Sequence, residues 1–596
     1  MRRLAIVVLA LLVALFVALA GCRSRASSPR RDAVFGDLSA ARGEPSLATD
    51  EVAAYLAVAR AELGSRTIPA VPSVRAGRRV FLSVFGVAPR PLVGSGLGAT
   101  LRDSVVAAAD ALRALAPDSA RAQRLALDVV TTRARDDRPH GAELGRFGYA
   151  ESDGERFGFV LPGELVWRGL LADDELTLDE RSLGALVDER FGASPSHARR
   201  HRFETTSFAQ LEARAPPIRL QRGMPMKTSA DRVDSDAMDA SARSAADHLS
   251  RACGDDGRFD YLYDAVRDLR SDDYNIIRHC GAAESLLEAY GAFGDPAHLS
   301  AASRALEFLK PKLLTDATDP IDATDQKAMH LENGKNALGP IGGTGLALIA
   351  FAKRAEVTHD LRDLEAMRAM ARFLVRQLQP NGEFAPYWPD AKDAWEVLYF
   401  PGEAMLGLMR LHALDPDARW LSAVVRAAER RLAVPPASAY DRDHDYWFIL
   451  TLDELHRVTG DRRWLEHAMR LVRAVVDGQR EDDARAAEHP STSFFDDDRV
   501  APAGSRLEAI AAAIALARRG GVDDGALVEC ASSLARFVLA QQYDQASSFA
   551  LPNPDRARGG FHGAPWSGEV RIDYDQHALV GLLGFTRALG QPHAPP

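Results

Sequence analysis

Cysteine is scarce in this chain of 596 residues, which contains 4 of them. Cys22, Cys253, Cys280 and Cys530 include no Cys-x-x-Cys pair, so the sequence predicts neither a zinc knuckle nor a disulfide framework. We expect the last three to be buried thiols.

Positive charge is also in short supply, because 73 Lys and Arg stand against 83 Asp and Glu and give a net charge of −10 at pH 7. The basic residues are scattered along the sequence rather than clustered. Nucleic-acid binding requires a basic surface that neutralises phosphates, so we expect no nucleic-acid partner.

The N-terminus carries an apolar run at 4–20 behind Arg2 and Arg3, and the run leads into Leu-Ala-Gly-Cys at 19–22. This motif resembles the lipobox of bacterial lipoproteins, which implies that Cys22 is acylated and inserts its lipid into a membrane. Arg23 rather than Asp follows the cysteine, and the resemblance then implies the outer membrane, facing the periplasm. The alternative is a transmembrane anchor, since roughly 17 apolar residues reach the lower limit for spanning a bilayer.

The chain is too long for one ordinary core, and its composition changes along its length, which predicts a multidomain protein. A signal segment and a flexible tether come first, followed by a smaller α+β domain, a Pro-rich linker and an all-helical domain. The expected boundaries are 1–22 for the signal, 23–70 for the tether with a short helix, 71–215, 216–230 and 231–596.

The α+β domain is expected to contain strands at 79–85, 125–130, 157–162 and 202–208 and a capped helix at 100–115. The Gly-Phe-Val-Leu-Pro strand at 158–162 and the Arg-Phe-Glu strand at 202–204 resemble the α+β domain of the AMMECR family.

The chain departs from that family at 93–98, where Val-Gly-Ser-Gly-Leu-Gly replaces a Gly-Cys-Ile-Gly stretch. Such glycines could form a loop that cradles a phosphate. No Lys-Ser/Thr follows them, so a turn is the favoured interpretation.

After residue 230 the sequence predicts helices of two alternating kinds. Amphipathic helices are expected at 237–249, 297–309, 361–378, 417–432, 462–476 and 525–540. Helices with small and apolar residues on nearly all sides are expected at 276–290, 342–351, 402–414, 446–458, 507–517 and 573–589. Buried helices ringed by amphipathic partners predict an (α/α)6 toroid.

This alternation resembles the six-hairpin (α/α)6 glycosidase-like superfamily, as do Tyr-Phe-Pro-Gly-Glu at 399–403 and Gly-Gly-Phe-His-Gly at 559–563. The resemblance implies an activity on carbohydrates as a class, without selecting a family. In such a toroid the long loops lead into the N-termini of the inner helices, which converge on one end.

Four acids near these helix starts are the candidate catalytic residues, namely Glu403, Glu508, Asp573 and Asp445. Pro401 and Gly402 predict an irregular helix start with Glu403 in the first turn. Buried carboxylates must either pair with arginines or have raised pKa values, and glycoside hydrolysis needs one protonated and one ionised carboxyl group. The alternative is that each acid caps or stabilises its helix.

Substrate binding is expected from aromatic faces that stack on sugars, from arginines that bind an acidic group and from two histidines. The histidines could serve as acid and base in epimerisation, or could be satisfied structural residues. The candidates are Tyr274, Arg278, His279, Tyr399, Trp447, Arg506, Arg571 and His577.

The leading hypothesis is therefore an exported, lipid-anchored glycan hydrolase or sugar epimerase. A lipoprotein that binds a glycan, a peptide or another polar ligand without turnover is the alternative, and a terpenoid-cyclase-like toroid is a further one. We expect no cofactor and no metal, because Asp443, His444 and Asp445 are adjacent residues whose side chains would point apart on a helix.

Overall fold

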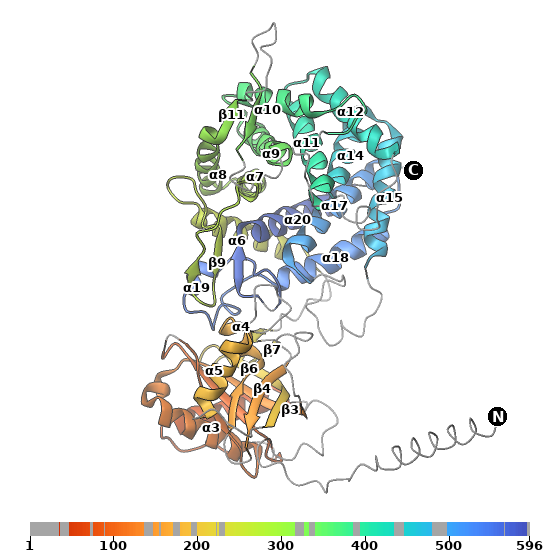
Figure 1. Cartoon of the computed structure of the whole chain (residues 1–596). Coiled ribbons are helices and arrows are strands. Elements are labelled where there is room, and N and C mark those ends of the chain that lie inside the picture. The colour runs from red at the N-terminus through yellow and green to blue at the C-terminus, as the bar shows by residue number, and fades with distance from the viewer. Residues whose placement is uncertain are drawn as a thin grey trace, which may run out of the picture.

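The computed structural model describes a sheet region followed by a ring of helices (Figure 1). Cys22 and Asp445 lie outside the described residues, so their predicted roles stay predictions. The described residues are 35, 47–71, 75–88, 90–135, 147–153, 157–170, 179–191, 199–221, 223–225, 233–315, 327–332, 340–384, 394–433, 446–479, 498–565 and 567–592.

The sheet region is built on an 8-stranded antiparallel sheet with the order β2-β1-β3-β6-β4-β5, in which β7 pairs with β6 and β8 with β7. The expected strands correspond to β1, β3, β5 and β6 and are confirmed. The strands are β1 (Val80–Phe85), β2 (Leu92–Gly96), β3 (Arg124–Arg135), β4 (Phe147–Ser152), β5 (Phe157–Val160), β6 (Arg199–Gln210), β7 (Ile218–Gln221) and β8 (Met224–Pro225).

Helices pack against the sheet. Helices α2 (Thr49–Leu63) and α3 (Leu101–Leu115) bury Leu82 and Leu127 on one face. As predicted, α3 is capped, with Thr100 and Asp103 forming a reciprocal capping box. The short elements η1 (Pro117–Arg121), α4 (Pro162–Trp167) and α5 (Glu180–Phe191) complete the region.

Two predictions for this region were wrong. The glycine-rich stretch is not a turn but mostly strand β2, and a Cβ on Gly94 or Gly96 would collide with the backbone of α3. The glycines therefore allow a helix to pack closely on a strand. The predicted linker contains β7 and β8, which extend the sheet, because Ser207 and Ala209 of β6 pair with β7.

The ring confirms the predicted alternation, since every expected helix overlaps an observed one. The inner helices are α7 (Ile276–Phe293), α9 (Pro340–Thr358), α11 (Ala394–Leu414), α14 (Tyr446–Thr459), α17 (Val500–Arg519) and α20 (Ile572–Gly590). The outer helices are α6 (Ser235–Ala252), α8 (Pro296–Leu309), α10 (Leu364–Gln377), α12 (Ala418–Ala433), α15 (Arg462–Asp477) and α18 (Gly525–Ala540).

Each inner helix packs against the next, and α20 returns to pack against α7 and α6, so the ring is closed (Figure 1). One apolar core runs through it, and the thiols of Cys253, Cys280 and Cys530 are free and buried, as predicted. Helix α17 alone among the described helices is long and apolar enough to cross a membrane, and 78% of its apolar window is buried in the protein.

Two inner helices begin earlier than the sequence predicted. Helix α11 begins at Ala394 and contains Pro401, so Glu403 lies in its third turn. Proline removes one hydrogen bond without ending the helix here. Packing on α14 supports the continued helix, since a Cβ on Gly402 would lie 2.6 Å from Trp447 Cβ. Glu508 likewise lies in the third turn of α17.

Short strands connect helices of the ring. Strands β9 (Leu262–Asp264), β10 (Leu269–Arg270) and β13 (Glu569–Arg571) form a small sheet at the starts of α7 and α20. The remaining elements are β11 (Leu313–Thr315), β12 (Met329–Leu331), η3 (Lys310–Lys312) and α19 (Pro554–Ala557).

Phe549 of the ring inserts into the sheet region and packs edge-on against Phe85 and Trp167, with ring centroids 4.8 and 5.8 Å away. Arg124 of β3 donates a hydrogen bond to the Phe549 carbonyl oxygen. The two regions are therefore in direct apolar and polar contact.

Candidate active site

An axial cavity of about 200 Å³ lies inside the ring, and every inner helix contributes to its wall. Glycine and alanine on α17 and α20 leave the space, since larger side chains at Ala512 and Gly584 would fill it. Representative lining residues, one from each inner helix, are Glu284, Leu346, Arg410, Trp447, Glu508 and Gln576.

Glu508 is the predicted catalytic acid that lines this cavity. It comes from α17, and the Nδ1 of His577 on the neighbouring α20 lies 2.8 Å from its Oε1. Burial raises the pKa of Glu508, which the nearby imidazole opposes. Burial alone would lower the pKa of His577, but the Glu508 carboxylate outweighs it, so the pKa is raised. The pair is thus a coupled acid and base.

Glu284 is a second cavity acid, and the sequence analysis missed it. It lies in the middle of α7 and has no hydrogen-bond or ion-pair partner among the described residues. Burial raises its pKa and the Glu288 carboxylate raises it further, while Lys353 opposes the shift. The signal was present, because carboxylates at 284 and 288 interrupt an otherwise apolar inner helix.

The opposite end of the cavity is lined by ion pairs. Glu288 accepts from Lys353 Nζ at 2.8 Å and from Arg587 Nη1 at 2.6 Å. Arg410 of α11 pairs with Glu454 of α14 at 3.0 Å. The expectation that the inner helices are apolar on nearly all sides was therefore wrong at this end of the cavity, where each charge is neutralised by a charge on a neighbouring helix.

Glu403 lies between α11 and α9 rather than in the wall of the axial cavity. It is 5% exposed, and its Oε2 is buried against Gly342 with no hydrogen-bond partner among the described residues. Burial raises its pKa to about 8. The carboxyl group is thus protonated at neutral pH.

Asp573 is held by two of the arginines expected to bind an acidic group, Arg571 and Arg278. Arg571 binds both of its carboxylate oxygens, at 2.6 and 3.0 Å, and Arg278 Nε lies 3.2 Å away. Arg278 also donates to the Tyr261 hydroxyl. Burial alone would raise the pKa of Asp573, but Arg571 and then Arg278 lower it below its usual value. The carboxylate is therefore ionised.

His279 was expected to bind substrate, and the structure places it elsewhere. Its side chain is fully buried, with Nδ1 2.5 Å from the Tyr274 hydroxyl and Nε2 2.9 Å from the Ala305 carbonyl oxygen. Burial lowers the pKa of His279 to about 4, so the ring is neutral. Both ring nitrogens of His279 therefore have partners within the protein. The Tyr274 hydroxyl, which contacts His279, also accepts a hydrogen bond from the Phe259 amide.

The remaining predicted binding residues are dispersed. Trp447 lines the axial cavity, whereas Tyr399 is half-buried and packs against the apolar core. Arg506 is buried, and its charge acts on the thiol of Cys530. Of the predicted residues, the cavity wall itself therefore contains Glu508 and Trp447.

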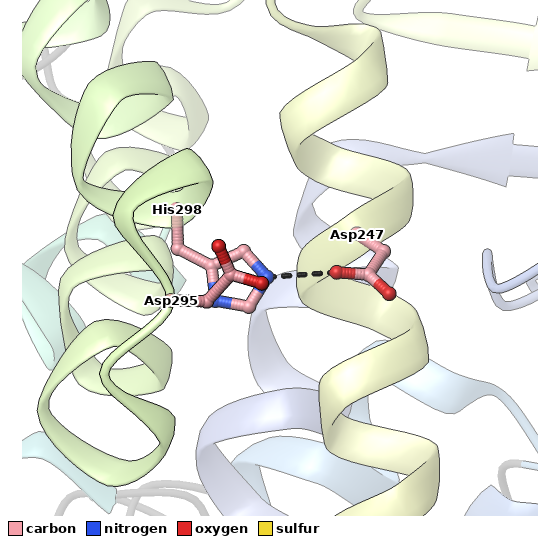
Figure 2. A group of neighbouring side chains, drawn as sticks. All are labelled: Asp247, Asp295 and His298. Carbon is pink, nitrogen blue, oxygen red and sulfur yellow. Dashed lines mark hydrogen bonds and ion pairs between the residues drawn. The ribbon is translucent and has the colours of Figure 1, made fainter.

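One group of side chains has the composition of a metal site. Asp247, Asp295 and His298 offer ligand atoms within 4.8 Å of one another, between α6 and α8 (Figure 2). His298 Nε2 lies 2.8 Å from Asp247, and Asp295 caps α8 through the Ala297 amide. These interactions account for the cluster without an ion, and none of the three residues lines the axial cavity.

No protein-family model matches the sequence, and a search of curated proteins gives no match. Among solved structures, the chain is similar to the GH76A α-1,6-mannanase from Salegentibacter sp. HEL1_6, with 14% identity and a TM-score of 0.41 over 59% of this chain and 99% of that one. It is also similar to the unsaturated glucuronyl hydrolase from Bacillus sp. GL1, with 13% identity and a TM-score of 0.40 over 59% and 96%. Likeness at this level transfers neither an activity nor a substrate to this chain.

Proposed function

We propose that this protein is a carbohydrate-active enzyme that hydrolyses or epimerises a glycan by carboxylate acid/base chemistry in the axial cavity. The observation that carries the proposal is that Glu508, which pairs with His577, lines the same cavity as Glu284, whose carboxyl group has no partner among the described residues. Titratable groups with perturbed pKa values in one concave site are the arrangement that acid/base catalysis requires.

The cavity also restricts the kind of substrate. Its volume of about 200 Å³ is below the roughly 300–1,000 Å³ of pockets that enclose drug-sized ligands, which favours one terminal sugar unit over an internal segment. Trp447 supplies an apolar face for stacking. Arg410 and Arg587 also line the cavity, but Glu454 and Glu288 neutralise them, so an acidic sugar is not favoured over a neutral one.

A glycan- or peptide-binding protein without turnover is the second candidate. Asp573 favours it, because a carboxylate held by Arg571 and Arg278 is unsuited to proton transfer. The terpenoid-cyclase-like alternative is disfavoured, because the cavity wall contains Glu284 and Glu508 where an apolar wall would be expected.

We further propose that the protein is exported and anchored by a lipid on Cys22 in the bacterial outer membrane, facing the periplasm. The motif at 19–22 and Arg23 after it support this location. Metabolic labelling with radioactive palmitate should mark the wild-type chain and not the C22A variant. Labelling of both, or of neither, would contradict the anchor.

The enzymatic proposal is tested by incubating the full-length protein in detergent with cell-wall and uronic-acid glycans and detecting released or epimerised sugars. We expect turnover by the wild type and a loss of about 100-fold or more in E508Q. E466Q is the matched control, because Glu466 is an exposed carboxylate of outer helix α15. Equal binding by wild type and E508Q with no turnover by either would favour the binding protein.

A further inference from the structure

We propose that Glu284, in the middle of α7, is the proton donor of this reaction and that the Glu508–His577 pair is its basic partner across the axial cavity. The inference rests on the function proposed above and deepens it by assigning the acid. Glu284 is not among the acids expected from the sequence, which were chosen because they lie near predicted helix starts.

The first argument is placement. Glu284 on α7 and Glu508 on α17 both line the axial cavity, although α7 and α17 are not neighbours in the ring. The two carboxyl groups are nevertheless close enough for the charge of Glu508 to act on Glu284. A sugar unit in the cavity would therefore lie against carboxyl groups from different sides.

The second argument is the lack of a direct partner for Glu284. The other cavity acids have partners, Glu288 in Lys353 and Arg587, and Glu508 in His577. In the described part of the chain, no hydrogen bond or ion pair holds Glu284, which lines the cavity. Its position therefore leaves the carboxyl group free to donate to a ligand.

The third argument is the difference in electrostatic surroundings. Burial and the charges of Glu288 and Glu508 raise the pKa of Glu284, and Lys353 and Arg410 oppose the shift. Burial also raises the pKa of Glu508, and the His577 imidazole, which is hydrogen-bonded to its carboxyl group, opposes that shift. Different surroundings can set two carboxyl groups apart as acid and base.

In hydrolysis, the C–O bond to the leaving sugar breaks and its electron pair goes to the leaving oxygen, which takes the proton of Glu284. Water bonds to the anomeric carbon and gives a proton to Glu508, leaving two free sugar hydroxyl groups. Transfer of that proton back to Glu284 through solvent in the cavity restores the starting state. Water is the only co-reactant.

Glu403 and Asp573 do not fit this role as well. Glu403 is protonated at neutral pH but is absent from the cavity wall. Asp573 is ionised by its two arginines and has no proton to give.

The test compares full-length wild type with E284Q on two substrates. One is the glycan turned over by the wild type, and the other is the nitrophenyl glycoside of the same terminal sugar, whose leaving group needs no proton. For E284Q we expect kcat to fall about 100-fold or more on the glycan and less than about tenfold on the nitrophenyl glycoside. E508Q should lose both activities, and E466Q should lose neither.

The outcomes separate the two proposals. Equal losses of E284Q on both substrates, or no loss on either, would overturn the role of Glu284 while leaving the enzymatic function intact. A wild-type protein inactive on every glycan and nitrophenyl glycoside would overturn the function itself.

A second readout reports the titration of Glu284 rather than the size of one rate. The alkaline limb of the wild-type kcat profile should disappear in E284Q, and the infrared band of a protonated carboxyl group at pH 7 should weaken in that variant. An unchanged band and an unchanged alkaline limb would overturn the assignment. The charged groups that act on Glu284 are Glu288, Lys353, Glu508 and Arg410, and Arg587 also lines the cavity.

Discussion

Replacing Glu403 with glutamine is expected to stabilise the protein at alkaline pH. The carboxyl group of Glu403 is 5% exposed and has no partner for its Oε2 among the described residues, and burial raises its pKa to about 8 from 4.5. Between these two values the folded protein holds a proton that the unfolded chain releases. Stability therefore falls as the pH rises through this window, and E403Q removes that loss.

The magnitude follows from the width of the window. Each pKa unit corresponds to about 1.4 kcal/mol, so between pH 5 and pH 8 the wild type is expected to lose about 4 kcal/mol relative to E403Q. The ring spans roughly 360 residues, and at about 2.1 cal/mol/K per residue its unfolding entropy is near 0.8 kcal/mol/K. The expected difference in Tm is then about 5 °C.

Differential scanning calorimetry of wild type and E403Q at pH 5, 7 and 8.5 measures this difference. The Tm of the two proteins should diverge progressively, with E403Q the more stable at pH 8.5. E466Q, which changes an exposed carboxylate in the same way, should follow the wild type throughout. A gap between wild type and E403Q that stays constant from pH 5 to pH 8.5 would refute a buried protonated Glu403.

Two further substitutions test the packing of the ring and its contact with the sheet region. E288Q leaves Lys353 and Arg587 without their shared carboxylate and should cost about 3–5 kcal/mol in urea unfolding at pH 7. Burial alone would raise the pKa of Glu288, but Lys353 and Arg587 lower it. The cost of E288Q should therefore shrink as the pH falls below about 4.5. An equal cost at pH 3 would contradict the ion pairs. F549A removes a ring packed between Phe85 and Trp167 and should cost about 3–5 kcal/mol, separating the melting of the sheet region from that of the helices in calorimetry. A single transition at the wild-type temperature would contradict this contact.

The sequence predicted the helices of the ring well because the burial of a helix face gives a periodic pattern of apolar residues. Outer helices such as α15 alternate apolar and charged faces, and inner helices such as α20 are apolar on most sides. Closure, by contrast, depends on contact between α20 and α7, which lie at opposite ends of the helical chain. Helix starts were harder to predict, because a proline such as Pro401 indicates the start of a helix, whereas α11 continues through it.

The site was predicted only in part, because the candidate acids were sought at the starts of the inner helices and not in the middle of them. Glu508 was identified, yet it belongs to a third turn and faces the ring axis. Glu284 could have been found from the four-residue spacing to Glu288, which places both acids on one face of an apolar helix. Their partners Lys353 and Arg587 come from other helices, so no local pattern reveals them.

The protonation of each acid is decided by the groups that lie against it. Asp573 meets two arginines and is ionised, Glu508 meets a histidine and shares a proton, and Glu403 meets a glycine and is protonated. All three begin as ordinary carboxyl groups buried to a similar extent, so burial alone would raise every one of their pKa values. The differences arise from Arg571, which lies two residues before Asp573, and from contacts between neighbouring inner helices. The chemistry available in the axial cavity is therefore a consequence of the order in which the inner helices meet.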